Sequence, residues 1–302
     1  MKTREKNIII GCLSAVLCEI LYGTSYLFTK EATKLASAFA LLGWRFLLAS
    51  ILMTILVILG IIKIDLRNKR IKPLLLVAFF CPCVYFILET IGIKHTTSSE
   101  TGVFLACIPI MSLLASTFIL KKKPTKFQIT GILVTLVGVI VTVFAVGLSA
   151  SLSVIGYAFL LAAVISYSLY CVFVDKASEF SGVEITYIML VAGAFLYTVL
   201  AISEALLQGN VRELIALPFE ERAFGIAILY QGIGCSLLAF FLSNIAIAKI
   251  GVNRTSSFIG ISTVTSIIAG VVFLHESFTI YQLIGAVIII IGVYVANAKI
   301  KE

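Results

Sequence analysis

The stretch TGVFLACIPIMSLLASTFILKKKPTKFQITGILVTLVGVIV, residues 101–141, occurs twice in this chain. Moved forward by 154 positions, it aligns without gaps with residues 255–295, and 11 of the 41 positions are identical. The matches include a glutamine and two glycines at one fixed spacing: Gln128/Gln282, Gly131/Gly285 and Gly138/Gly292. Such matches are hard to obtain by chance in an apolar sequence, so the chain contains an internal repeat.

The composition is that of an integral membrane protein. Of the 302 residues, 61% are hydrophobic and 13% are charged, and the mean hydropathy is +1.14, whereas soluble domains are roughly 45–50% apolar and 25% charged. The net charge of +8 is carried by short loops between apolar runs, which argues against a nucleic-acid partner. The seven cysteines lie inside apolar runs without zinc-ligand spacing, so we expect core side chains and no metal site.

Ten apolar runs are long enough to cross a bilayer as helices, which takes about 20 residues each. They cover residues 8–29, 37–62, 74–93, 100–120, 127–146, 154–174, 185–207, 223–247, 253–274 and 280–298. With the N-terminus inside, the inner segments carry 17 Lys and Arg residues and the outer loops carry 5. Because positively charged loops stay inside, we expect a multi-pass protein of the cell membrane with both termini cytoplasmic.

The two copies of the repeat are five helices apart, so they must cross the membrane in opposite directions. Their loop charges differ accordingly, because three lysines at residues 121–123 on the inner side align with His-Glu-Ser at residues 275–277 on the outer side. Inverted repeats are typical of alternating-access transporters. The sequence therefore predicts an all-α integral membrane protein of ten transmembrane helices in two inverted five-helix repeats, residues 8–146 and 154–298.

Motifs in both copies resemble the repeat of the EamA branch of the drug/metabolite transporter superfamily. In the first copy they are residues 92–101 (GIKHTTSSET), Pro109 and residues 128–131 (QITG). In the second copy they are residues 246–255 (AIAKIGVNRT), His275-Glu276 and residues 282–285 (QLIG). Tyr22-Gly23 and Trp44-Arg45-Phe46, nearer the start of the chain, also resemble this family. The resemblance covers nearly the whole chain and implies a carrier of small metabolites, amino acids and related amines among them, with export common. The family's Glu after the fourth helix of a half is Glu276 in the second copy but Lys122 in the first, so a site need not be symmetric.

Glu19 is the most central charged residue of the predicted spans. It lies 11 residues beyond Ile8, about 16 Å into the membrane at 1.5 Å per residue. Tyr22 and Tyr26 share its helix face, and a carboxylate with two aromatic rings suits an ammonium group. We expect Glu19 to bind a cation or exchange protons during transport, with a structural ion pair to Arg45 as the alternative.

Arg45 and Glu89 are the other charged residues inside predicted spans. Arg45, which follows Trp44 in the second span, could bind a substrate carboxylate through two N–H groups or neutralise one of the acids. Glu89, with Tyr85 one turn away in the third span, could line the cavity or pair with Arg45. Two ionised acids and one base leave a charge of −1, which favours a cationic or zwitterionic amine as substrate.

The second half offers polar rather than charged candidates. They are Tyr167 in the sixth span, and Gln231 and Asn244 in the eighth. The two amides are the stronger candidates because a buried amide needs a partner, whereas aromatic rows in membrane helices usually serve packing. We assign the paired glycines of the repeat to packing between the halves or to a dimer contact.

The leading functional hypothesis is a secondary-active transporter of amino acids or related amines, an exporter, with proton coupling left open. The alternative is an uptake carrier or exchanger for an organic cation such as a quaternary amine. The chain has no G-x-x-x-x-G-K-[ST] motif, so we expect no nucleotide or other cofactor and energy from a gradient. A membrane-embedded enzyme lacks support because the two histidines lie at loop ends, and a channel because polar residues are too few. The expected partners are a small-molecule substrate, the lipid bilayer and, as an open alternative, a second copy of the chain.

Overall fold

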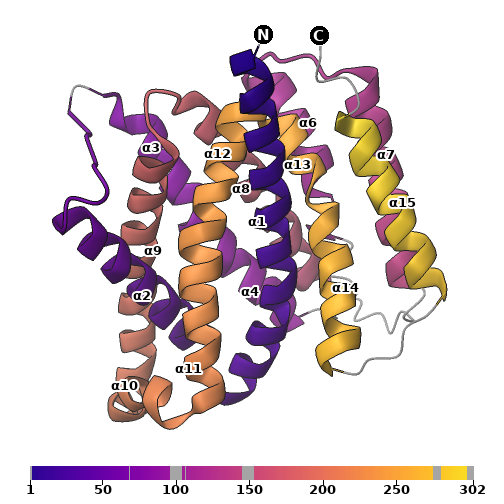
Figure 1. The fold of residues 1–302 in the computed structure, drawn as a ribbon. Coiled ribbons are helices and arrows are strands. Elements are labelled where there is room, and N and C mark those ends of the chain that lie inside the picture. The colour runs from indigo at the N-terminus through magenta and orange to yellow at the C-terminus, as the bar shows by residue number, and fades with distance from the viewer. Residues whose placement is uncertain are drawn as a thin grey trace.

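The computed structural model describes residues 2–67, 69–95, 104–105, 107–144, 153–274 and 280–297. Within these ranges the regular structure is entirely helical (Figure 1). Six helical runs are long and apolar enough to span a membrane: Glu5–Ser25, Ala38–Ile58, Ile71–Gly92, Val154–Lys176, Gly182–Gln208 and Arg222–Ile250. Shorter apolar helices cover Ile108–Ile119, Lys126–Val141 and Leu283–Asn297. The expected class, a multi-pass helical membrane protein, is thus confirmed, while the count of ten spans stays a prediction.

The first half of the chain forms one long helix followed by shorter ones. Its elements are α1 (Lys2–Leu35), α2 (Ala38–Ile58), α3 (Ile71–Ala78), the π-helical segment η1 (Phe79–Val84), α4 (Tyr85–His95), α6 (Ile108–Ile119) and α7 (Lys126–Phe144). The segments α3, η1 and α4 follow one another without a gap and form a single broken span.

The second half repeats this order with an additional helix, α10. Its elements are α8 (Val154–Lys176), α9 (Gly182–Gln208), α10 (Val211–Glu220), α11 (Arg222–Leu229), the π-helical segment η2 (Tyr230–Ala239), α12 (Phe240–Ile250), α13 (Val252–Ser257), α14 (Gly260–Leu274) and α15 (Ile280–Asn297). The start of α1 and the end of α15 lie at the same end of the bundle (Figure 1).

Helices α7 and α15, the last of each half, lie side by side with their glycines in contact (Figure 1). A Cβ at Gly131 would lie 2.3 Å from the backbone nitrogen of Ala296, and one at Gly138 would lie 2.8 Å from the carbonyl oxygen of Gly285. A Cβ at Gly292 would lie 2.7 Å from the carbonyl oxygen of Gly131. Contacts on α15 therefore move backward as α7 advances, so these repeat-equivalent helices are antiparallel, as an inverted repeat predicts. The glycines pack between the halves of one chain.

The third and eighth spans contain π-helical segments at equivalent positions. The segments η1 and η2 contain Cys81 and Cys235, which are 154 positions apart, the offset of the repeat. In η1 the backbone of Cys81 leaves the helical region (φ −146°, ψ 121°) directly before Pro82, which has no N–H for a helical hydrogen bond. The third span is therefore discontinuous, as are helices at the substrate sites of many secondary transporters.

Two ion pairs join the halves near helix ends. One involves the loop after α2, and the other involves the loop after α6 and the end of α8. Lys69 lies 2.7 Å from Glu184 at the start of α9, and Lys122 lies 2.8 Å from Asp175 at the end of α8. Lys122 is the residue that replaces the family's Glu in the first copy of the repeat. Its pairing with Asp175 gives this departure a structural reason, because a Glu there would face another carboxylate.

We predict that Gly292→Val destabilises the protein, because the new side chain would collide with the backbone of α7, which cannot move aside as a side chain can. Overpacking of this kind costs about 1–3 kcal/mol or more, and it should lower the thermal unfolding temperature of the purified protein in detergent. Gly234→Ala is the matched control, because its Cβ would have its nearest neighbour at 3.7 Å. Equal unfolding temperatures for the two variants would contradict the α7–α15 contact.

Candidate functional site

Arg45 joins α2 to the π-helical segment of the eighth span. Its side chain is 5% exposed. Its Nε donates to Ser236 Oγ at 2.6 Å and its Nη1 donates to Gln231 Oε1 at 3.3 Å, and both partners belong to η2. The guanidinium carbon also lies 4.8 Å from the ring centroid of Phe86, a cation–π contact. The structure thus brings together two predicted site residues, Arg45 and Gln231.

Gln231 extends this network to α1. It is 1% exposed, and its Nε2 donates to Thr29 Oγ1 at 2.9 Å. Neither Thr29 nor Ser236 was among the residues predicted from the sequence. Comparison of the two halves offers a signal for Ser236, because it occupies the position equivalent to the helix-breaking Pro82 at the repeat offset of 154.

The predicted pair Tyr85 and Glu89 forms a second polar group beside Arg45. The Tyr85 hydroxyl donates to Glu89 Oε1 at 2.6 Å, and the Tyr85 ring lies 5.3 Å from the ring of Tyr167 on α8. Glu89 shares α4 with Phe86, whose ring lies 4.8 Å from the guanidinium carbon of Arg45, and among the described residues the two charges form no ion pair within 4.0 Å. Tyr167 therefore contributes an aromatic wall from the second half to the site.

Glu19 lies on the α14 side of α1 and is 5% exposed. Ser262 of α14 is the hydroxyl residue that acts on its carboxyl group, while the Ser262 hydroxyl donates to the carbonyl oxygen of Ile259 at 2.7 Å. The two helices touch one turn further along, where a Cβ at Gly23 would lie 2.5 Å from the carbonyl oxygen of Ser262. Tyr22 contacts Phe240 at 6.4 Å between ring centroids. The side chain of Tyr26 lies outside the described part of the structure.

Glu19, Arg45 and Glu89 are not paired with one another. Among the described residues, ion pairs within 4.0 Å form elsewhere in the chain and include none of these three. The sequence left open a structural pair between Arg45 and one of the acids, and no such contact is present at ion-pair distance. Buried ionisable groups within a membrane that lack a charged partner are characteristic of functional sites.

Asn244 and Trp44 have partners outside this group. The Tyr170 hydroxyl donates to Asn244 Oδ1 at 2.9 Å, and Asn244 Nδ2 donates to Thr186 Oγ1 at 3.0 Å, so Asn244 connects α8, α9 and α12. Trp44 Nε1 donates to the carbonyl oxygen of Leu214 on α10 at 2.9 Å. Although Trp44 precedes Arg45 in sequence, adjacent helix positions differ by about 100° in direction, so the two side chains reach different neighbours.

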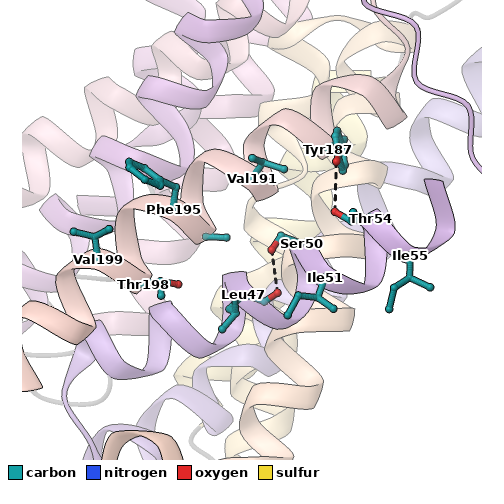
Figure 2. Close-up of a pocket in the computed structure, with 11 residues that line it drawn as sticks. Leu47, Ser50, Ile51, Thr54, Ile55, Tyr187, Val191, Phe195, Thr198 and Val199 are labelled. Atoms are coloured by element: carbon teal, nitrogen blue, oxygen red, sulfur yellow. Dashed lines mark hydrogen bonds between the residues drawn. The ribbon is translucent and has the colours of Figure 1, made fainter. Parts of the chain in front are cut away.

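A groove of about 570 Å³ lies between α2 and α9 (Figure 2). Its lining is mostly apolar: Leu47, Ser50, Ile51, Thr54, Ile55, Tyr187, Val191, Ala194, Phe195, Thr198 and Val199. Thr54 donates to the Tyr187 hydroxyl at 3.4 Å, whereas Thr198 Oγ1 is buried without a hydrogen-bond partner. Because none of Glu19, Arg45 and Glu89 lines this groove, we place the candidate substrate site at the charges instead.

Within the described ranges, no group of three or more His, Cys, Asp or Glu side chains could hold a metal ion. The candidate site consists of a buried guanidinium, two carboxyl groups, hydroxyls, an amide and aromatic rings. Such groups can bind and orient a polar molecule through charge and hydrogen bonds. Polar groups beside a discontinuous membrane helix are an arrangement found in membrane transporters.

Comparison with known proteins identifies the family. The EamA-like transporter family matches residues 9–144 and 154–298, and the chain belongs to this family. The Bacillus subtilis protein named "Uncharacterized transporter YcxC" is 32% identical over 292 residues, covering 96% of this chain and 93% of that protein. "Uncharacterized transporter YetK" from the same organism is 25% identical over 288 residues, covering 93% and 84%. A solved crystal structure with 20% sequence identity has a TM-score of 0.76 over 95% of this chain and 98% of the other, which shows the same fold.

We predict that Asn244→Ala lowers stability, because it removes two buried hydrogen bonds, the one from the Tyr170 hydroxyl and the one to Thr186 Oγ1. Tyr170 keeps its contact with Ser243 at 3.3 Å and Thr186 keeps its bond to the Gly182 carbonyl, so each lost bond should cost about 0.5–1.5 kcal/mol. The loss should appear as a lower unfolding temperature in detergent. Asn210→Ala is the control, since Asn210 makes an exposed side-chain contact with Gln208. An Asn244→Ala protein as stable as this control would argue against a scaffold role for Asn244.

Proposed function

We propose that this protein is a secondary-active exporter of small amine-bearing metabolites, amino acids among them, and that it works by alternating access. The observation that carries the proposal is the set of three ionisable residues inside the bundle, Glu19, Arg45 and Glu89, with no ion pair among them. Family membership supports the class of carrier. Two halves whose last helices pack antiparallel support a rocking movement about a central site.

Glu19 is the residue we assign to coupling or cation binding. It belongs to α1 of the first half, which packs closely against Ser262 on α14 of the second half, where a Cβ at Gly23 would lie 2.5 Å from the carbonyl oxygen of Ser262. Movement of the halves against each other would change this contact and the access of water to the carboxyl group. A carboxyl group whose surroundings alternate in this way can bind and release a proton or an ammonium group during the cycle.

A second candidate is an uptake carrier or exchanger for an organic cation such as a quaternary amine. The excess of acid over base in the interior favours it, as does the aromatic contact of Tyr22 with Phe240 one turn from Glu19. The two candidates differ in whether the transported molecule carries a carboxylate.

We predict that Glu19→Gln abolishes transport while the protein still folds, since glutamine keeps the hydrogen-bonding capacity toward Ser262 but cannot carry charge. The measurement is uptake of radiolabelled amino acids and amines into proteoliposomes, with and without an imposed pH gradient. Glu31→Gln is the matched control, because Glu31 forms an exposed ion pair with Lys34 on the same helix.

Near-normal uptake by Glu19→Gln at several pH values would refute the role of Glu19. Uptake by the wild-type protein that does not respond to a pH gradient, but is lost in Glu19→Gln, would favour cation binding over proton coupling. Failure of the wild-type protein to transport any compound of the panel in either direction would count against the proposed function itself.

A further inference from the structure

Arg45 carries a positive charge inside the bundle that no carboxylate of the described chain neutralises at ion-pair distance. Its side chain is 5% exposed, and no acid among the described residues lies within 4.0 Å of its nitrogens. An isolated charge inside a membrane-spanning helix is energetically unfavourable. A guanidinium buried inside the bundle without an anionic partner indicates that a bound ligand supplies the anion.

The hydrogen-bonding capacity of Arg45 is only partly used. A guanidinium has five N–H donors, and the described structure engages two of them, with Ser236 and with Gln231. Three donors are left without an acceptor in the described residues. Phe86 lies 4.8 Å from the guanidinium carbon and stabilises the charge through its ring without using a donor.

The orientation of the guanidinium is fixed before any ligand arrives. Ser236 holds Nε, Gln231 holds Nη1, and Gln231 is itself held by its bond to Thr29 on α1. A planar fork with a fixed orientation suits a carboxylate, which can accept two parallel N–H bonds. Ser236 and Gln231 are therefore positioning residues, because they act on the ligand only through Arg45.

We propose that the three free N–H groups of Arg45 bind the carboxylate of the transported molecule. The substrate is then an amino acid or another carboxylate-bearing amine, and not a permanently charged amine without an acid group. This inference rests on the proposed function, of which it names the substrate class. Glu89 lies on α4 with Phe86, whose ring contacts the Arg45 guanidinium, so a zwitterion placing its ammonium group toward Glu89 would satisfy both charges.

The test uses matched sets of small molecules that differ at the carboxylate alone. Leucine is compared with leucinamide and isopentylamine, and phenylalanine with phenylalaninamide and phenethylamine, alongside other amino acids and choline. Binding is measured as the shift in unfolding temperature of the purified full-length protein, since a ligand that binds only the folded state raises it. The expected result is that at least one amino acid stabilises the protein while its amide and its decarboxylated amine do not.

Arg45→Gln should weaken binding of that amino acid about 10- to 100-fold, the usual effect of losing a charge-assisted hydrogen bond. Arg45→Lys should restore part of the affinity as a point charge without the planar fork. Arg212→Gln, which removes an exposed arginine in α10, is the control and should bind as the wild type does. Unchanged affinity in Arg45→Gln overturns the proposal.

Gln231→Glu tests the same idea without removing Arg45, and it keeps the proposal falsifiable if Arg45→Gln does not fold. The new carboxylate would pair with Arg45 internally and compete with the ligand. We expect an unfolding temperature at or above that of the wild type together with loss of the amino-acid response. Gln208→Glu places the same change at the exposed end of α9 and should keep the response. A Gln231→Glu protein that binds the amino acid with wild-type affinity overturns the proposal.

The outcome separates this inference from the proposed function. Equal stabilisation by an amino acid and its decarboxylated amine, or by choline alone, overturns the carboxylate anchor while leaving a transporter of organic cations. Transport of amines in proteoliposomes without any response to amino acids has the same meaning. Binding of an amino acid that depends on Arg45, without transport across the membrane, supports the anchor and removes the transporter proposal.

Discussion

The need of every buried polar group for a partner within the protein governs this structure. Lipid offers no hydrogen bonds, so irregular backbone can exist at membrane depth only where protein surrounds it. In η1 the carbonyl oxygens freed by the break are reached from the second half: Tyr197 donates to Pro82 O at 3.0 Å, and Ser166 donates to Phe80 O at 2.8 Å. The break in η1 must therefore lie against the second half. This requirement brings polar side chains to the centre of an otherwise apolar bundle.

The contacts between the halves are symmetric at the glycine interface of α7 and α15. They are asymmetric at the candidate site around Arg45. The glycines of α7 and α15 meet reciprocally across an approximate two-fold axis. Helices α2 and α9 begin at equivalent N-cap serines, Ser37 and Ser181, which are 144 positions apart. At this offset Arg45 corresponds to Met189. The second half therefore keeps the helix but replaces the charge with an apolar side chain, and the single guanidinium is a property of one half.

Much of the fold follows from the sequence because the signals are local. Apolar runs, short charged loops and a repeat with shared glycines predict a helical membrane protein with packed halves, and Glu19, Arg45 and Glu89 stand out as charges inside apolar runs. The partners of those charges do not follow from spacing. Ser236 is 191 residues from Arg45, and which side chains meet depends on the tilt and rotation of helices, which packing decides. The described residues contain six helical runs long enough to span a membrane, so the ten spans predicted from hydropathy stay a prediction.

In the proposed mechanism, the distribution of charges between the halves would link ligand binding to movement. Two of the three ionisable residues, Glu19 and Arg45, lie on α1 and α2 of the first half, yet the hydrogen-bond partners of Arg45, Ser236 and Gln231, and the helix packed against Glu19, α14, belong to the second half. The first half thus supplies charge and the second supplies neutral hydroxyl and amide groups. Movement between the halves must alter the surroundings of both charges, and a ligand that neutralises them must in turn favour one arrangement of the halves. The same interfacial contacts therefore allow binding energy to bias the conformational equilibrium.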